Sequence, residues 1–167
     1  VKTAISNLSV STMGHTNIGA GINTANQQFG RSPGVVWVEI LLTDGIPNRP
    51  GTADSFTESS AEYARGFAQN AHTAGITLYT IGLGDSTDST YGISYYFLDD
   101  KPASGHTYRP GDPAGNNYAH DGLAYIGGGH FYPAPTPADL QLMFEQISQE
   151  ISNIAGKDVV VTEVLPS

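Results

Sequence analysis

The sequence contains no cysteine. Disulfide bonds, thiolate metal sites and cysteine nucleophiles are therefore excluded, although the absence does not decide the cellular compartment. At 167 residues the chain has the length of one ordinary domain, which is enough to bury a hydrophobic core.

Charged residues are scarce, and basic ones especially so. Only 14% of residues are charged, and seven Lys and Arg face sixteen Asp and Glu, for a formal net charge of -9. This balance argues against binding to nucleic-acid phosphates or to an anionic membrane surface, and it is compatible with divalent cations. Much of the surface must be uncharged Ser, Thr, Asn, Gln and Gly, which is common in extracellular and cell-envelope proteins. We therefore expect an extracellular or cell-surface location.

Several functional signatures are also missing. No apolar run approaches the roughly 20 residues of a transmembrane helix. Neither the Gly-x-Ser-x-Gly turn of hydrolases nor a phosphate-binding Gly-Lys-Ser/Thr occurs, and Gly82-Leu83-Gly84 lacks the third glycine of a dinucleotide site. The sequence therefore does not predict an enzyme.

The most informative stretch that is present is an apolar run at residues 35–42, followed by Thr43-Asp44-Gly45. Its near-continuous β-branched and aliphatic character predicts a central strand of a parallel sheet, covered on both faces. Ligands of open α/β sheets collect beyond the carboxyl ends of the strands, which makes Asp44 a candidate ligand. The alternative is that Asp44 only starts a turn.

Helices alternate with the strands. We expect a helix capped by Thr16, and a second helix, capped by Ser55 or Thr57, that runs to about Ala74. Gly75 then fits a left-handed residue that ends this helix, before a strand at residues 76–81. Strand, helix and strand joined by short connections predict a right-handed parallel unit.

The second half of the chain is less regular. Residues 85–117 read as a long irregular loop, whose many tyrosines favour an ordered loop packed on itself or on a partner, and residues 118–126 as a short helix. A short strand near residues 130–132 precedes an amphipathic helix that Thr136 and Pro137 open and Gly156 stops. The predicted fold class is α/β, a Rossmann-like parallel sheet flanked by helices.

Four segments, which follow one another along the chain in the order typical of that family, resemble the von Willebrand factor type A (vWA) family. They are Gly14-His15-Thr16-Asn17-Ile18-Gly19 before a helix, the strand that ends in Thr43-Asp44-Gly45, the strand from Ala74 through Gly84, and Ile126-Gly127-Gly128-Gly129-His130-Phe131-Tyr132. The last segment is similar to the bacterial branch. The resemblance implies a partial vWA-like domain at residues 1–156, the C-terminal portion of that fold. Residues 157–167 are expected to form a tail strand that could open a following β domain.

The resemblance also implies a metal-ion-dependent adhesion site. Two of its ligands map onto Thr16 and Asp44, which would hold Mg²⁺, or Mn²⁺ or Ca²⁺ in its place. Hydroxyl and carboxylate oxygens suit such hard cations, and an open coordination position can take a carboxylate from a partner protein.

The family's Asp-x-Ser-x-Ser motif has no convincing counterpart. Asn7-Leu8-Ser9-Val10-Ser11 matches only superficially, because Asn7 lacks the charge and Ser11 is too near Thr16 to leave room for the intervening elements. We therefore expect weak or no cation binding by this chain alone, with the N-terminal half supplied by another chain or segment. Without that half, the strand at residues 36–42 would have a hydrophobic open edge. The charge of Glu39 would give only weak protection against the pairing of this edge with other chains.

Two competing metal sites are conceivable. Zinc could bind among His106, His120 and His130 with Asp112 and Asp121, but their spacing matches no short zinc motif and each is more simply a surface or packing residue. The second set comprises aspartates that could hold calcium but lack the alternate-residue spacing of a calcium loop: Asp85, Asp88, Asp99 and Asp100.

Three classes of function remain. A vWA-like protein-binding or adhesion module is favoured by the four segments. A structural subunit of a cell-surface filament or pilus-like assembly is the alternative, and a metal-dependent enzyme is a distant third. An Asp-x-Ser-x-Ser motif in a preceding segment would favour the first class, and its absence the second.

Overall fold

A parallel three-stranded sheet forms the centre of the molecule. The computed structural model describes residues 15–30, 32–43, 47–50, 57–84, 95–106, 120–134 and 136–157. Strands β1 (Trp37–Thr43), β2 (Ile76–Leu83) and β3 (Gly128–Ala134) lie in the order β1-β2-β3, and both pairings are parallel. The α/β fold and the three strands predicted from sequence are confirmed.

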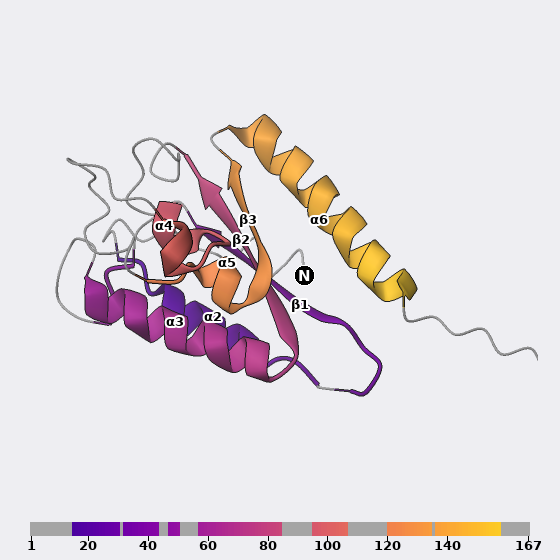
Figure 1. The fold of residues 1–167 in the computed structure, drawn as a ribbon, viewed down its shortest axis with the longest axis horizontal. Helices are drawn as coiled ribbons and strands as arrows, with labels where there is room; N and C mark the ends of the chain where they lie inside the picture. The colour runs from indigo at the N-terminus through magenta and orange to yellow at the C-terminus, as the bar shows by residue number, and fades with distance from the viewer. Residues whose placement is uncertain are drawn as a thin grey trace, which may run out of the picture.

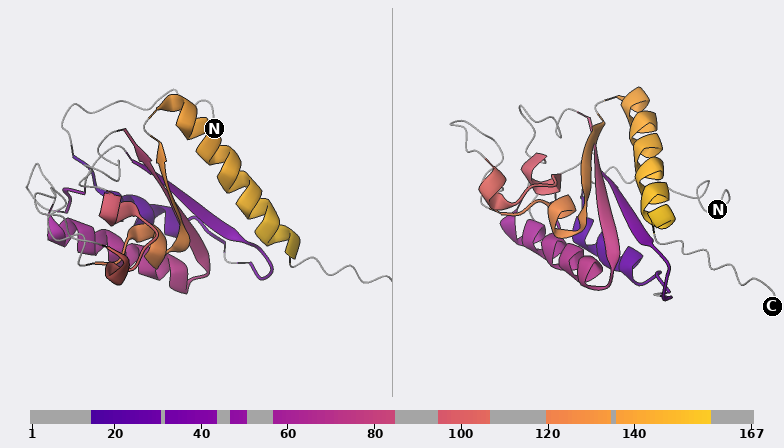
Figure 2. Two further views of the ribbon diagram at one scale, coloured as in Figure 1. Left: turned by 45° about the horizontal axis from the view of Figure 1, so that its top comes forward. Right: turned by 45° about the vertical axis from the view of Figure 1, so that its right-hand side comes forward.

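Helices cover both faces of the sheet. Figures 1 and 2 show α2 (Ile18–Asn26), α3 (Glu58–Thr73) and α5 (Leu123–Ile126) on one face and the long helix α6 (Pro137–Lys157) on the other. Each face has its own apolar cluster. Ile22, Ala64 and Leu78 belong to the first, whereas Tyr79, Ile81 and Ile147 belong to the second. Both faces of β2 are thus covered, which explains why its apolar residues do not alternate strictly with polar ones.

The helix ends follow the predicted signals with two exceptions. Thr57 caps α3, and Gly75 adopts a positive φ of 79° immediately after that helix, as expected. The cap of α2, however, is Asn17, whose side chain accepts the Ala20 N–H at 3.0 Å, so the expected cap at Thr16 is wrong. Helix α6 also continues through Gly156 to Lys157, because one glycine weakens a helix without having to end it.

The stretch expected to be irregular contains ordered, buried structure. Within it lie α4 (Tyr95–Leu98) and a 3₁₀ turn, η2 (Ala103–Gly105). Phe97 and Leu98 are fully buried in the same cluster as α2 and α3. The prediction of irregular backbone is therefore wrong for α4 and η2, whereas a packed, ordered segment was expected from its tyrosines. The helix expected at residues 118–126 is limited to Leu123–Ile126 in the described part.

Strand β1 lies at the edge of the described sheet, not at its centre. Within the described residues it pairs with β2 alone, and Ile40 and Leu42 are 37% and 43% exposed. Glu39 does not protect this edge as a surface charge, because it is only 8% exposed. Among the described residues, its Oε2 has no hydrogen-bond partner, and burial raises the pKa of the Glu39 carboxyl to about 7.

Some predicted segments lie outside the described residues. They include Asp44, the Asn7–Ser11 match and residues 158–167 of the expected tail, and the domain boundary after residue 156 stays a prediction. Among the described helices, none is both long and apolar enough to cross a membrane.

Candidate metal site at the carboxyl end of the sheet

Thr16 lies directly beside the chain that follows β1. The Thr16 N–H donates to Asn48 Oδ1 at 2.7 Å, and the Asn48 N–H donates back to the Thr16 carbonyl at 3.1 Å. Asn48 is almost fully buried, so this reciprocal pair is shielded from water and fixes the two segments together.

The hydroxyl of Thr16 remains available to a ligand. Asn17 caps α2 in its place, and Thr16 is only partly buried. Within the described part of the chain, Thr16 forms its hydrogen bonds through the backbone and none through Oγ1. A side-chain oxygen is thus presented at the amino end of α2 without a competing partner.

Asp44, the second expected ligand, lies outside the described residues. It directly follows Thr43, the last residue of β1, and stands four positions before Asn48 in the chain. Asn48, which is bonded to Thr16, lies five residues after the end of β1 at Thr43. The sheet geometry favours proximity of the two ligands, and the distance between them stays a prediction.

A positive charge borders this position. The Arg49 guanidinium contacts the His15 ring at 2.7–2.8 Å, and its Nη1 donates to the Asn48 carbonyl at 3.0 Å. A guanidinium opposes the binding of a cation nearby. Thr16 supplies no negative charge, so a cation here depends on carboxylates such as Asp44.

The described aspartates of the calcium alternative do not converge on one point. Asp99 is buried and has both carboxylate oxygens 3.1 Å from His106 Nε2, whereas Asp100 contacts His130 Nδ1 at 3.1 Å. Burial raises the pKa of Asp99 to about 6, and His106 partly opposes this shift. Asp85 and Asp88 lie outside the described residues.

The histidines of the zinc alternative are also separated. His106 contacts Asp99, His130 contacts Asp100, and His120 contacts Glu58 and Glu62 of α3. The three histidines therefore do not form one zinc site, in line with the simpler interpretation of each as a surface or packing residue. Instead, Glu58, Glu62 and His120 form the one group of potential metal ligands found among the described residues. The four-residue spacing of Glu58 and Glu62 in a helix was the available sequence signal.

The family model of the von Willebrand factor type A domain matches residues 1–115. The chain belongs to this family. The match includes Thr16 and the Thr43-Asp44-Gly45 turn, so the resemblance found in the sequence is confirmed for these segments. Neither the curated proteins nor the solved structures give a match to the chain.

Membership explains the general character of the site. Domains of this family are generally non-catalytic modules for protein interaction, they are often extracellular, and many hold a divalent metal ion at the carboxyl end of the sheet. In this chain, the backbone of Thr16 is hydrogen-bonded to Asn48, in the segment that follows β1.

Proposed function

We propose that this vWA domain is a protein-binding or adhesion module, not an enzyme, that acts outside the cell or at its surface. Thr16 and Asp44 would hold a divalent cation, Mg²⁺ in the first place and Mn²⁺ or Ca²⁺ as substitutes. The observation that carries the proposal is the mutual hydrogen bonding of Thr16 and Asn48, which places an unoccupied hydroxyl beside the chain that leaves β1.

The chemistry fits recognition of an acidic partner. Mg²⁺ prefers six oxygen ligands and keeps several waters, so one hydroxyl and one carboxylate leave positions that a partner's carboxylate can enter. Two protein ligands with Arg49 nearby make a weak site. We propose that the remaining ligands come from an Asp-x-Ser-x-Ser segment in another chain or in a further segment of a longer protein.

A titration of the 167-residue chain with Mn²⁺, followed by electron paramagnetic resonance, tests the ligand assignment. We expect binding only at millimolar concentrations, lost in Asp44→Ala and reduced several-fold in Thr16→Ala, because each change removes one oxygen ligand. Thr24→Ala, on the exposed side of α2, is the matched control and should bind as the wild type does. Unchanged Mn²⁺ binding in Asp44→Ala would remove Asp44 from the site.

The open edge of β1 supports the partner proposal. In a parallel pair, alternate amides and carbonyls of β1 point away from β2, and the exposed side chains of Ile40 and Leu42 adjoin them. Soluble proteins avoid long open edges of this kind because they add strands from other chains. We therefore propose that a strand of a second polypeptide or segment covers β1.

Amide exchange with mass measurement tests this edge. For the isolated chain we expect fast exchange at alternate residues of β1 (Trp37–Thr43), slowing by orders of magnitude once the covering strand is bound. The matching residues of β2, which is paired on both sides, should be slow in both states. A stable monomer that protects every amide of β1 without any bound fragment is incompatible with the proposal.

The same edge also favours the alternative function. Strand addition between successive copies would build a filament, so the chain could be a structural subunit of a surface or pilus-like assembly. The two functions differ in their dependence on the cation. Loss of partner binding in both Thr16→Ala and Asp44→Ala supports adhesion, whereas assembly that tolerates both changes supports the structural subunit.

A further inference from the structure

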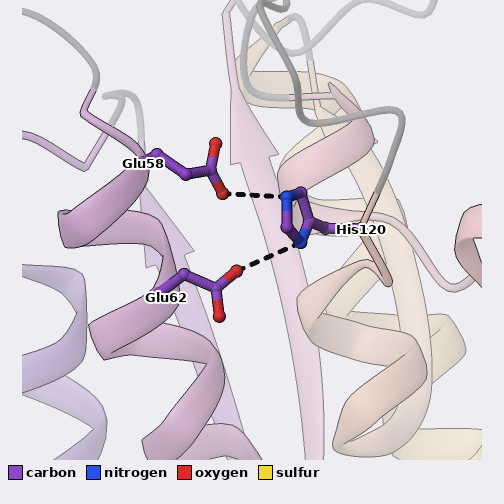
Figure 3. A group of neighbouring side chains, drawn as sticks. All are labelled: Glu58, Glu62 and His120. Atoms are coloured by element: carbon purple, nitrogen blue, oxygen red, sulfur yellow. Dashed lines mark ion pairs between the residues drawn. The ribbon is translucent and has the colours of Figure 1, made fainter.

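A second cluster of metal-binding side chains lies away from Thr16. Figure 3 shows Glu58 and Glu62, one turn apart on α3, facing the His120 ring from the segment before α5. Glu58 Oε1 lies 3.3 Å from His120 Nε2, and Glu62 Oε1 lies 3.2 Å from His120 Nδ1. One potential ligand atom from each residue lies within 4.8 Å of the others.

A buried arginine holds the two carboxylates in position. The Arg65 side chain is 6% exposed, and its Nη1 donates to Glu58 Oε1 at 2.9 Å and to Glu62 Oε1 at 2.7 Å. Arg65 is itself fixed by a bond from Nε to the Asp121 carbonyl and by the Phe97 ring beneath its guanidinium. Hydrogen bonds of this kind orient the carboxylate ligands of metal ions.

The second oxygen of each carboxylate remains available. Within the described part of the chain, Glu58 and Glu62 use Oε1 for their contacts with Arg65 and His120, and neither Oε2 has a partner. The three side chains are partly exposed, so an ion can reach them from solvent. The two carboxylates lie at different ring nitrogens of His120, so an ion would take one of these nitrogens together with carboxylate oxygens that lie within 4.8 Å of it.

The charges and atom types select the kind of ion. Two carboxylates against one guanidinium leave one net negative charge, which favours a cation. An imidazole nitrogen among the ligands disfavours Mg²⁺ and Ca²⁺, which require oxygen, and suits Zn²⁺ and related transition metals. Three protein ligands with a fourth position for water are a regular zinc arrangement.

We infer that Glu58, Glu62 and His120 bind Zn²⁺ at a site separate from the cation held by Thr16 and Asp44. The ion joins the amino-terminal turns of α3 to the segment that enters α5 and β3. Because the unfolded chain does not hold these three residues together, zinc stabilises the folded state in proportion to its binding.

Calorimetric titration with Zn²⁺ tests the site. We expect one ion per chain, an affinity at least tenfold lower in His120→Ala and in Glu62→Gln, and a higher thermal midpoint with zinc for the wild type only. Glu62→Gln keeps the size of an exposed side chain, so it tests the ligand even where His120→Ala fails to fold. The visible absorption of Co²⁺ bound in place of Zn²⁺ should likewise be weakened in His120→Ala and in Glu62→Gln.

The control is His130→Ala. His130 is an exposed histidine that contacts only one carboxylate, that of Asp100, among the described residues, whereas His120 contacts two carboxylates. Its loss should therefore leave zinc affinity unchanged. Asp44→Ala and a large excess of Mg²⁺ should also leave it unchanged, which separates this site from the Mn²⁺ site. Absence of zinc binding at millimolar concentration, or equal binding by wild type and both ligand variants, would show that the cluster is only an ion-pair network.

Discussion

Replacing Glu39 by glutamine is expected to raise the free energy of unfolding at pH 8 by about 2–3 kcal/mol while changing it little at pH 4. Glu39 is buried at the edge strand β1, and the part of the chain that the structure describes offers its Oε2 no hydrogen-bond partner. A glutamine of the same size removes the buried charge that the wild-type chain must carry at high pH. The variant therefore gains stability only where the glutamate is ionised.

The direction follows from the raised pKa. The pKa of the Glu39 carboxyl is about 7 in the folded chain, against 4.5 for an unperturbed glutamate. Between these two values the folded protein keeps a proton that the unfolded chain has released, so a rise in pH favours unfolding. The resulting loss of stability begins near pH 4.5 and is complete above about pH 7.

Urea unfolding of wild type and Glu39→Gln at a series of pH values measures the difference. Asp99, whose pKa is also raised, is present in both chains, so its contribution cancels when the two curves are subtracted. Glu145→Gln on the exposed side of α6 provides a matched change of charge, with an expected effect within about 0.5 kcal/mol. Parallel curves for wild type and Glu39→Gln would mean that water reaches the Glu39 carboxylate.

The Gly122→Ala variant is expected to unfold about 10 °C below the wild type, which corresponds to a loss of about 3 kcal/mol. A Cβ at residue 122 would lie 2.1 Å from the backbone oxygen of Asp99 and 2.2 Å from its Oδ1. The Gly122 N–H also donates to the Lys101 carbonyl at 3.0 Å, so the two segments cannot separate without breaking a bond. The clash is steric, since the φ of -71° at Gly122 suits any residue.

Gly105→Ala is the control for this substitution. A Cβ at Gly105 in η2 would meet Lys101 Cβ at 3.4 Å, an ordinary contact, and the melting temperature should move by no more than about 2 °C. Differential scanning calorimetry on both variants gives the comparison. Equal melting temperatures for Gly122→Ala and the wild type would show that α4 and α5 can move apart at little cost.

The regular elements were accessible from sequence because their signals are local. The apolar run before Thr43, the glycine at position 75 and the pair Thr136–Pro137 each specify their own backbone, and the structure has the corresponding strand and helix ends. The family resemblance added the order of these elements. Thr16 was singled out in the same way, by its motif before a helix, and its role as a metal ligand stays a prediction.

The remaining features depend on contacts between distant residues. Phe97 and Leu98 lie in a stretch rich in glycine, serine and proline, which gives no local sign of burial. They belong to the core only because they pack against the apolar residues of α2 and α3. Likewise, Glu58 and Glu62 read as exposed helix residues until His120, about 60 residues away, is placed opposite them. The buried state of Glu39 could not be inferred either, since a glutamate in a strand is ordinarily an exposed one.

The pairing of the strands bears on how this chain folds. Trp37 pairs with Ile76, and Leu78 with Gly128, so the partners are separated by about 40 and about 50 residues. Contacts of such long range require loops to close before any pairing energy is gained, which slows folding relative to helical proteins. During synthesis β1 leaves the ribosome well before β2 and β3, and its apolar residues have no partner in that interval. The chain should therefore be most prone to aggregate while it is being made, and a binding protein that arrives early at β1 would act as a folding aid as well as a partner.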